Sequence, residues 1–503
     1  MQQNKTFIKQ LIFLFFYLLI GLNIYSQNNG QPVSIQKLNN EIEKLKNDKT
    51  LRHASWSVCV MSVKTAKVIS EYKSEQSLIP ASTMKIVTIG AALSILGKDY
   101  QFETTLEYDG SIDSKGILHG NIYIKGGGDS SFGSDRFDSI TKIENIYNKW
   151  IQAIKKKGIS KIEGSVIADA EIFDRDLIPS TWIWKDIGNY YGTGTCGLSV
   201  NENLYKLIFK PGNRIGYKAK ILRTEPDVPD INFINNVKTG RQGSGDNVII
   251  YGSPYSNTRF LEGTVPLGRK EFTVKGSMPD PAYFCAYSFS KYITEKGITI
   301  NKPATTVRIL KLKGIYNESQ KNKISNYLSP TLEDIIKMTN INSINSYAET
   351  LLKFIGWLKL NDGSTESGIK AVKQFWLSKN VDLSGFLMKD GSGLSPVNRI
   401  TTKQLSEMLC VITKDKVYEP FFNSLPVAGK SGSIKNLFKA TTAENNLRAK
   451  SGYLSGVRAY AGYVNNKKNE QIVFSVIINN YQGSPFLMKK KLEKLMILIA
   501  ETE

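Results

Sequence analysis

The sequence predicts a mixed α/β (α+β) fold in which the two ends of the chain form one domain around a large β-rich insertion. Both ends of the 503-residue chain carry strand-like alternation and amphipathic helices. The middle differs, because its short strands are split by Gly, Asp and Asn turns. The length, with 41% hydrophobic residues, is enough for two or three domains. We therefore expect one domain from residues 27–100 and 326–503, and inserted β-rich domains over 101–325.

Local patterns define the elements near the amino terminus. Residues 34–48 carry apolar side chains at helical spacing, which predicts a helix with one packed face. Residues 55–63 and 66–72 alternate in polarity on either side of a Lys-Thr turn, which predicts a hairpin. Residues 84–97, after Pro80, are apolar nearly all round and end at a glycine, so we expect a helix buried in the domain interior.

The carboxyl-terminal end supplies further strands and a helix. Residues 452–464 and 471–480 read as strands that flank the turn "NNKKNE". Residues 486–501 predict a final helix. The lysine runs at 155–157 and 489–491 fall in amphipathic helical patterns, so we expect them on exposed faces.

The first 26 residues resemble a secretory signal peptide. Lys5 and Lys9 precede an apolar run over residues 11–22, no acidic residue occurs, and Ser26 offers a small residue for cleavage. The alternative is an uncleaved anchor, which the run favours less because a spanning helix needs about 20 apolar residues. We therefore expect an exported protein.

The mature chain is strongly basic. The sequence has a formal net charge of +21, and loss of two lysines and no acids with residues 1–26 leaves +19. Such an excess favours contact with polyanions. An exported protein rarely meets nucleic acid, so we expect no nucleic-acid partner, and an anionic envelope polymer or a membrane surface is the better candidate for peripheral contact. A basic face that is merely solvated is favoured over any dedicated binding site, and the sequence specifies no oligomeric state.

The supply of histidine and cysteine restricts the chemistry. His53 and His119 are the only histidines, so histidine-based nucleophilic sites and multi-histidine metal sites are poorly supplied, and we expect no metal or cofactor. The cysteines are scattered without a C-x-x-C pair, which predicts buried free thiols: Cys59, Cys196, Cys285 and Cys410. A serine enzyme of this composition needs a base other than histidine.

Ser82 and Lys85 are the candidate nucleophile and base. Residues three apart on a helix share a face, so their side chains can meet in the first turn of the predicted helix. An apolar site lowers the pKa of a lysine, which lets its amine accept a proton. Nearby backbone N–H groups favour developing negative charge. The S-x-x-K spacing occurs five more times, but only here does it open a long apolar helix.

Two further segments carry suitable groups. Ser343 and Asn345 precede an amphipathic helix, where a hydroxyl could relay a proton and an amide could hold a substrate; the alternative is a helix cap. Lys450, Ser451 and Gly452 head a strand, where the lysine and hydroxyl suit a carboxylate and the glycine allows close approach of a substrate backbone.

In this order the three segments resemble the S-x-x-K, S-D-N and K-T-G set of penicillin-binding proteins and class A β-lactamases. The chain is similar to the class C low-molecular-mass penicillin-binding proteins, serine D-alanyl-D-alanine carboxypeptidases and endopeptidases with an insertion in the transpeptidase domain. "IPASTMK", "IKGGGDSSF", "YYGTGTCGLSVNEN", "KDGSGLSPVN" and "RAKSGYLSGVRAYAGYV" carry the likeness over nearly the whole mature chain. Ser343 lies 261 positions after Ser82, a gap that argues against a β-lactamase.

The resemblance implies a transpeptidase-like domain with an antiparallel sheet and helices, in a periplasmic enzyme that hydrolyses peptidoglycan stem peptides and binds β-lactams as inhibitors. It also implies an acyl-enzyme without a cofactor. The catalytic residues would be Ser82, Lys85 and Ser343, and the substrate-binding residues Asn345, Lys450, Ser451, Gly452 and Tyr453. Ser451 stands where the family usually has threonine, and Ile344 where a polar residue is common. The likeness further suggests that the loop with Asp390 and Ser392 borders the active site.

Other interpretations remain at this stage. Ser199-Val200-Asn201 also fits S-x-N, and Lys430-Ser431-Gly432 is a second K-S-G, but neither is followed by the expected long helix or clear hairpin. A β-lactamase or esterase could use the same site. A non-catalytic envelope-binding protein is the alternative of another class.

Overall fold

The computed structural model describes residues 32–137 and 139–503. The predicted signal peptide and uncleaved-anchor alternative lie outside these residues. Within them, no helix has the length and apolar character needed to cross a membrane.

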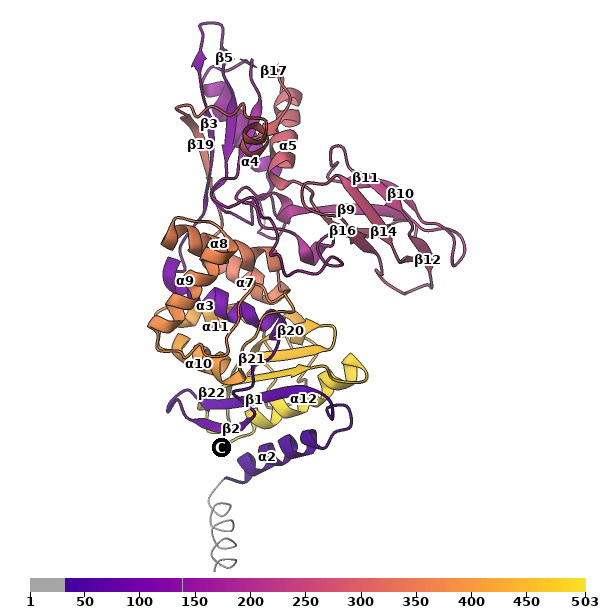
Figure 1. The fold of residues 1–503 in the computed structure, drawn as a ribbon, viewed down its shortest axis with the longest axis vertical. Helices are drawn as coiled ribbons and strands as arrows, with labels where there is room; N and C mark the ends of the chain where they lie inside the picture. The colour runs from indigo at the N-terminus through magenta and orange to yellow at the C-terminus, as the bar shows by residue number, and fades with distance from the viewer. Residues whose placement is uncertain (1–31, 138) are drawn as a thin grey trace, which may run out of the picture.

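A five-stranded antiparallel sheet joins the two ends of the chain (Figure 1). Its strands, in spatial order, are β2 (Val68–Tyr72), β1 (Ser55–Ser62), β22 (Gln471–Asn479), β21 (Val457–Asn465) and β20 (Arg448–Leu454). The predicted hairpin is confirmed as β1 and β2, and β1 pairs along its whole length with β22, with Val58 opposite Val476. β20 lies at one edge of the sheet. The predicted α/β class and antiparallel sheet are therefore confirmed.

Helices cover both faces of this sheet (Figure 1). One face carries α2 (Val33–Lys46) and α12 (Pro485–Ala500), and the other carries α3 (Met84–Leu96), α7 (Leu332–Asn342), α8 (Asn345–Leu360), α9 (Thr365–Ser378), α10 (Thr402–Ile412) and α11 (Tyr418–Ser424). Successive residues of β22 alternate between the two cores: Val473 belongs to the core on the side of α10, whereas Phe474 belongs to the core that includes residues of α2 and α12. As predicted, α3 is buried on nearly every side.

The middle of the chain forms separate layers with their own core. Its strands are β3 (Glu103–Tyr108), β4 (Ser111–Ile112), β5 (Ile117–His119), β6 (Ile122–Lys125), β7 (Lys161–Ile162), β8 (Val166–Asp169), β9 (Leu204–Lys210), β10 (Lys220–Glu225), β11 (Asn232–Asn235), β12 (Lys238–Gly240), β13 (Ile249–Tyr251), β14 (Thr258–Glu262), β15 (Thr264–Pro266), β16 (Phe272–Ser277), β17 (Thr299–Ile300), β18 (Thr305–Thr306) and β19 (Asn322–Leu328). Its helices are α4 (Ile143–Lys156), α5 (Pro281–Glu295) and α6 (Val307–Leu312). The strands from β9 to β16 project sideways as an arm (Figure 1).

The path of the chain refines the predicted domain limits. The chain enters the insertion on β3 and leaves it on β19, and these two strands pair, with Glu103 opposite Leu328. The predicted boundary at residues 325 and 326 cuts through β19. A paired strand belongs with its partner, so we propose residues 101–328 as the insertion.

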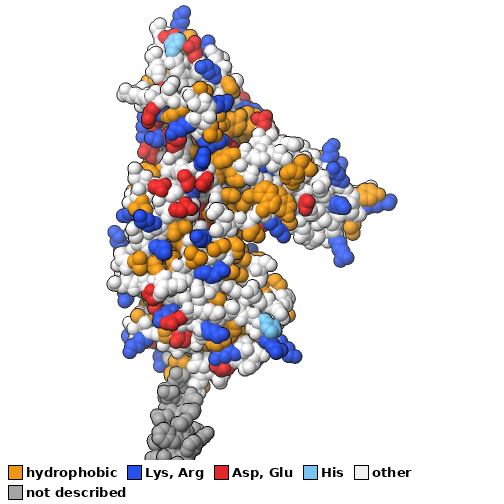
Figure 2. Space-filling view, viewed as in Figure 1, with side chains coloured by type: hydrophobic (Ala, Val, Ile, Leu, Met, Phe, Trp, Pro, Cys, Tyr) orange, Lys and Arg blue, Asp and Glu red, His pale blue; other side chains and the backbone are white. Residues whose placement is uncertain are grey.

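The structure shows where the cysteines and the basic residues lie. The four cysteines are buried and free, as predicted. Lysines and arginines spread over the visible face, interspersed with acidic and apolar side chains (Figure 2). On this face, the distribution suits a solvated basic surface better than one concentrated polyanion site.

Candidate active site

Ser82 lies in a short 3₁₀ turn, Ala81–Thr83, which leads directly into α3. The sequence placed it in the first turn of the α-helix; the structure places it just before, because i→i+3 hydrogen bonds tighten the helix entry. Ala81 adopts a left-handed conformation, with φ 47°. The hydroxyl of Thr83 donates to the carbonyl oxygen of Pro80 at 2.8 Å. Residues three apart still share a face, so Ser82 and Lys85 point the same way.

The Lys85 amine is fully buried and surrounded by three oxygen atoms. Its Nζ lies 3.2 Å from the Ser82 Oγ, 2.6 Å from the Asn345 Oδ1 and 2.8 Å from the Ser392 carbonyl oxygen. A neutral amine has two N–H groups and one lone pair. The amide and carbonyl oxygens can accept only, so they take the two N–H groups, and the lone pair is left for the Ser82 hydroxyl.

Burial sets the protonation of this amine. Desolvation lowers the pKa of Lys85 from 10.5 to about 7, although the charges of Asp390 and Glu349 act in the opposite direction. A lysine in this range is a base near neutral pH.

Glu349 supports the loop that contacts the lysine. It is buried on α8, and its carboxylate accepts the backbone N–H groups of Gly391 at 3.0 Å and Ser392 at 2.8 Å. Burial and the charge of Asp390 raise the pKa of Glu349 to about 8. Glu349 was not among the residues predicted from the sequence. Its position could have indicated a role in the site, because an acidic residue four positions after Asn345 lies on the same, otherwise buried, face of the helix.

Ser343 and Lys450 are joined by a hydrogen bond between their side chains. Ser343 takes a left-handed conformation, φ 57° and ψ 42°, at the junction of α7 and α8. The Lys450 amine donates to the Ser343 hydroxyl at 2.9 Å and to the Ser451 carbonyl at 3.0 Å. Burial, and then the neighbouring Lys85, lower the pKa of Lys450 well below its usual value. Positive charge on Lys85 thus disfavours positive charge on Lys450.

The edge strand β20 runs directly beside the nucleophile. A Cβ atom on Gly452 would lie 2.5 Å from the Pro80 carbonyl oxygen and 3.1 Å from the Ser82 nitrogen, so this close approach requires glycine. Tyr453 follows with a side chain that is 54% exposed, stacked against the guanidinium of Arg458 at 4.2 Å. The hydroxyl of Ser451 lies 2.5 Å from that of Ser433.

The insertion also contacts the site, which the sequence did not predict. The Asn345 side chain donates to the carbonyl oxygen of Tyr191 at 2.7 Å. The indole of Trp182 donates to Asp390 at 2.8 Å, and Asp390 also accepts the backbone N–H groups of Gly393 and Ser395. The loop expected to border the site is therefore held from both domains.

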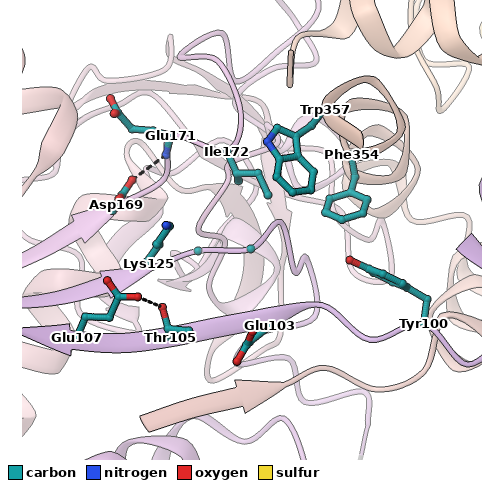
Figure 3. Close-up of a pocket in the computed structure, with 12 residues that line it drawn as sticks. Tyr100, Glu103, Thr105, Glu107, Lys125, Asp169, Glu171, Ile172, Phe354 and Trp357 are labelled. Atoms are coloured by element: carbon teal, nitrogen blue, oxygen red, sulfur yellow. Dashed lines mark hydrogen bonds between the residues drawn. The ribbon is translucent and has the colours of Figure 1, made fainter. Parts of the chain in front are cut away.

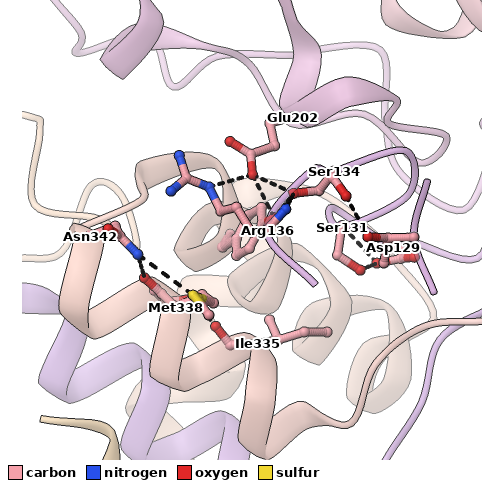
Figure 4. A network of polar contacts seen from close by, with 11 residues as sticks. Asp129, Ser131, Ser134, Arg136, Glu202, Ile335, Met338 and Asn342 are labelled. Carbon is pink, nitrogen blue, oxygen red and sulfur yellow. Dashed lines mark hydrogen bonds and ion pairs between the residues drawn. The ribbon is translucent and has the colours of Figure 1, made fainter. Parts of the chain in front are cut away.

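A polar network around Glu202 ties the insertion to Tyr347 on α8, and Figure 4 shows Glu202 with Ser134 and Arg136. The carboxylate of Glu202 accepts from the hydroxyls of Ser134 at 2.6 Å and Tyr347 at 3.0 Å, and from the Arg136 guanidinium at 2.6 Å. Tyr347 lies two residues after Asn345 on α8. This network fixes the start of α8 against the insertion.

The two rival motifs make contacts within their own segments. The hydroxyl of Ser199 is buried and donates to the Cys196 carbonyl oxygen at 3.2 Å. Lys430 is exposed in a turn, where the Ser431 hydroxyl accepts the N–H of Val427. The structure instead brings together the segments around Ser82, Ser343 and Lys450.

Comparisons with known proteins find similarity in sequence and in fold. A family model described as the D-Ala-D-Ala carboxypeptidase 3 (S13) family matches residues 38–501. A D-alanyl-D-alanine carboxypeptidase from Actinomadura sp. (strain R39) is 25% identical over 89% of this chain and 82% of its own length. The carboxypeptidase DacB of Haemophilus influenzae is 24% identical over 84% of this chain and 85% of its own. The crystal structure of penicillin binding protein 4 (dacB) from H. influenzae matches with a TM-score of 0.77 and 22% identity, covering 92% of this chain and 99% of that one.

Proposed function

Because the chain belongs to the D-Ala-D-Ala carboxypeptidase 3 (S13) family and is a serine D-Ala-D-Ala carboxypeptidase, we propose that Ser82 is its nucleophile and Lys85 its general base. The substrate is a peptidoglycan stem peptide that ends in D-Ala-D-Ala. The observation that carries this proposal is the placement of the Lys85 amine, buried and 3.2 Å from the Ser82 hydroxyl.

Acylation begins with transfer of the Ser82 proton to the Lys85 lone pair. The Ser82 oxygen attacks the carbonyl carbon of the penultimate D-Ala, and the carbonyl oxygen becomes an oxyanion. The backbone N–H groups of Ser82 and Tyr453 would stabilise this charge, which the close approach of β20 at Gly452 supports. Collapse of the intermediate breaks the peptide bond and leaves an ester on Ser82.

The leaving amine of the last D-Ala needs a proton. We assign its delivery to Ser343, whose hydroxyl can relay the proton that Lys85 accepted. The Asn345 amide would hold the substrate peptide, and water then hydrolyses the ester with Lys85 again as the base. The substrate backbone can add to β20 as an extra strand, because β20 is an edge of the sheet.

Lys450 and Ser451 would bind the terminal carboxylate. Burial disfavours positive charge on Lys450 in the free site. A bound carboxylate brings an opposite charge and raises the pKa of the amine, so the ammonium form becomes stable when substrate arrives. Lys450 and Ser451 would therefore recognise the carboxylate at the end of the peptide, and they would bind the carboxylate of a β-lactam in the same way. The H. influenzae relative has been solved in complex with a β-lactam, which supports β-lactam binding by this chain.

Release of D-Ala from a stem pentapeptide tests the assignment. We expect the mature protein to convert the pentapeptide to a tetrapeptide, and we expect Ser82→Ala and Lys450→Met to lose this activity. Lys430→Met, in the rival K-S-G, is the matched control and should retain it. Activity in Ser82→Ala would refute the proposed nucleophile.

Two finer proposals follow from the same site. We propose a periplasmic location, where the stem peptides are found. Cleavage of a crosslinked dimer, measured beside the pentapeptide, would reveal endopeptidase activity in addition. Rapid turnover of penicillin without a lasting adduct would favour the β-lactamase alternative.

A further inference from the structure

A cavity lies where the insertion meets α8 (Figure 3). Its volume is about 570 Å³, which is within the range of small-ligand sites. Phe354 and Trp357 line it, nine and twelve residues after Asn345 on α8, which is roughly 14 and 18 Å along the helix axis. The cavity is therefore distinct from the site around Ser82.

One wall of the cavity is the polar face of a sheet. Glu103, Thr105 and Glu107 alternate along β3, so their side chains share one face. Lys125 on β6 is paired with Thr105, and Asp169 on β8 is paired with Lys125, which places the three residues in one row across neighbouring strands. This row presents both cationic and anionic side chains to the cavity.

The Lys125 amine and the Glu107 carboxylate can each form further hydrogen bonds with a ligand. The Glu103 carboxylate is engaged by Lys323 at 2.6 Å, whereas that of Glu107 accepts only the Thr105 hydroxyl at 2.8 Å among the side chains that the structure describes. Within the described residues, the Lys125 amine has no ion-pair or side-chain hydrogen-bond partner. An amine donor and a carboxylate acceptor side by side suit a neutral ligand with hydroxyl and amide groups.

The opposite wall is aromatic. The rings of Tyr100 and Phe354 lie 5.5 Å apart, and those of Phe354 and Trp357 lie 5.3 Å apart. Phe354 is buried, but Trp357 is 36% exposed and borders the cavity. Figure 3 shows these rings across the cavity from Lys125 and the carboxylates. An apolar ring surface that faces polar groups suits a sugar, whose C–H faces pack on rings while its hydroxyls form hydrogen bonds.

We propose that this cavity binds the glycan part of peptidoglycan, a chain of N-acetylated hexosamines. A sugar ring packs on Trp357, its acetamido oxygen accepts from the Lys125 amine, and its hydroxyls donate to Glu107 and Asp169. The proposal rests on the proposed function, because the stem peptides are attached to this glycan. Engagement of glycan and peptide by separate sites would raise the effective concentration of stem peptides at the active site.

Calorimetric titration with a tetramer of N-acetylglucosamine, which has no peptide, tests the proposal on the intact protein. We expect the wild type to bind it, and Trp357→Ala to bind at least about tenfold more weakly. Lys125→Ala should weaken binding too, and Trp357→Tyr, which keeps a ring, should retain most of it. Leu358→Ala is the matched control: its side chain is 46% exposed on the same helix but outside the cavity, so its binding should be unchanged.

Two other outcomes would overturn the glycan site. One is failure of the tetramer to bind the wild type, or equal binding by Trp357→Ala. The other is binding of tetralysine in place of the sugar, abolished by Glu107→Gln, which would identify a site for cationic peptides. Penicillin acylation of Ser82, measured on each variant, reports the folding and the proposed function separately from this result.

Discussion

The protonation of Lys85 predicts how the rate of acylation depends on pH. The fall of its pKa from 10.5 to about 7 corresponds to a free-energy difference on the order of 5 kcal/mol in favour of the neutral amine. With a pKa of about 7, roughly one tenth of the molecules carry the neutral amine at pH 6 and roughly nine tenths at pH 8. Since only the neutral form accepts the Ser82 proton, acylation should accelerate about tenfold between these pH values.

The assay is the second-order rate of acylation by a fluorescent penicillin, measured from pH 5.5 to 9 with tryptophan fluorescence as a check on folding. We expect a rising limb of unit slope with a midpoint near pH 7. Lys85→Arg keeps a cation that does not lose its proton, so its rate should fall by at least about a hundredfold. A rate that is flat from pH 5.5 to 8, or a midpoint near pH 10, would show that the buried amine is not the base.

Three substitutions probe other parts of the site. Gly452→Ala brings a Cβ within 2.5 Å of the Pro80 carbonyl oxygen, so β20 must shift; we expect acylation to slow by at least about tenfold, measured with the same penicillin. Ser343→Ala removes the hydroxyl that accepts from the Lys450 amine. We expect the kcat of D-Ala release to fall by about 10²- to 10³-fold with little change in KM, and an unchanged kcat would exclude the proton relay through Ser343. Asp390 accepts hydrogen bonds from the N–H groups of Trp182, Gly393 and Ser395, and Asp390→Asn replaces one of its oxygen atoms by a donor. We expect this change to lower the free energy of unfolding, measured in urea, by about 2–3 kcal/mol, and wild-type stability would contradict the prediction.

The parts of the fold set by local patterns could be predicted from the sequence. The apolar run of α3 and the alternation of β22 each depend on neighbouring residues, and the structure has these elements close to the expected limits. The stretch expected as a strand over residues 452–464 is instead divided between β20 and β21 by a turn at Ser455 and Gly456. The pairing of β1 with β22 joins residues about 400 positions apart, and no local period encodes it. The pairing of β19 with β3 at the end of the insertion is also long-range, so the boundary predicted from the sequence fell within β19.

In the candidate site, too, the contacts between residues close in sequence could be predicted, and the contacts between distant segments could not. The spacing of Ser82 and Lys85 is local, so a helical period was enough to predict their proximity. The contacts of Asn345 with Tyr191, and of Asp390 with Trp182, depend on how the insertion folds back on α8. Resemblance to a family supplied the residues to compare, whereas their distances required the structure.

The most direct measurement is the intact mass of the mature protein after incubation with benzylpenicillin. We predict that the wild type gains the mass of one penicillin molecule, that peptide mapping places the adduct on Ser82, and that Ser82→Ala gains nothing. An adduct of equal yield on Ser82→Ala, or a wild type that stays unmodified while folded, would contradict the assignment of the nucleophile.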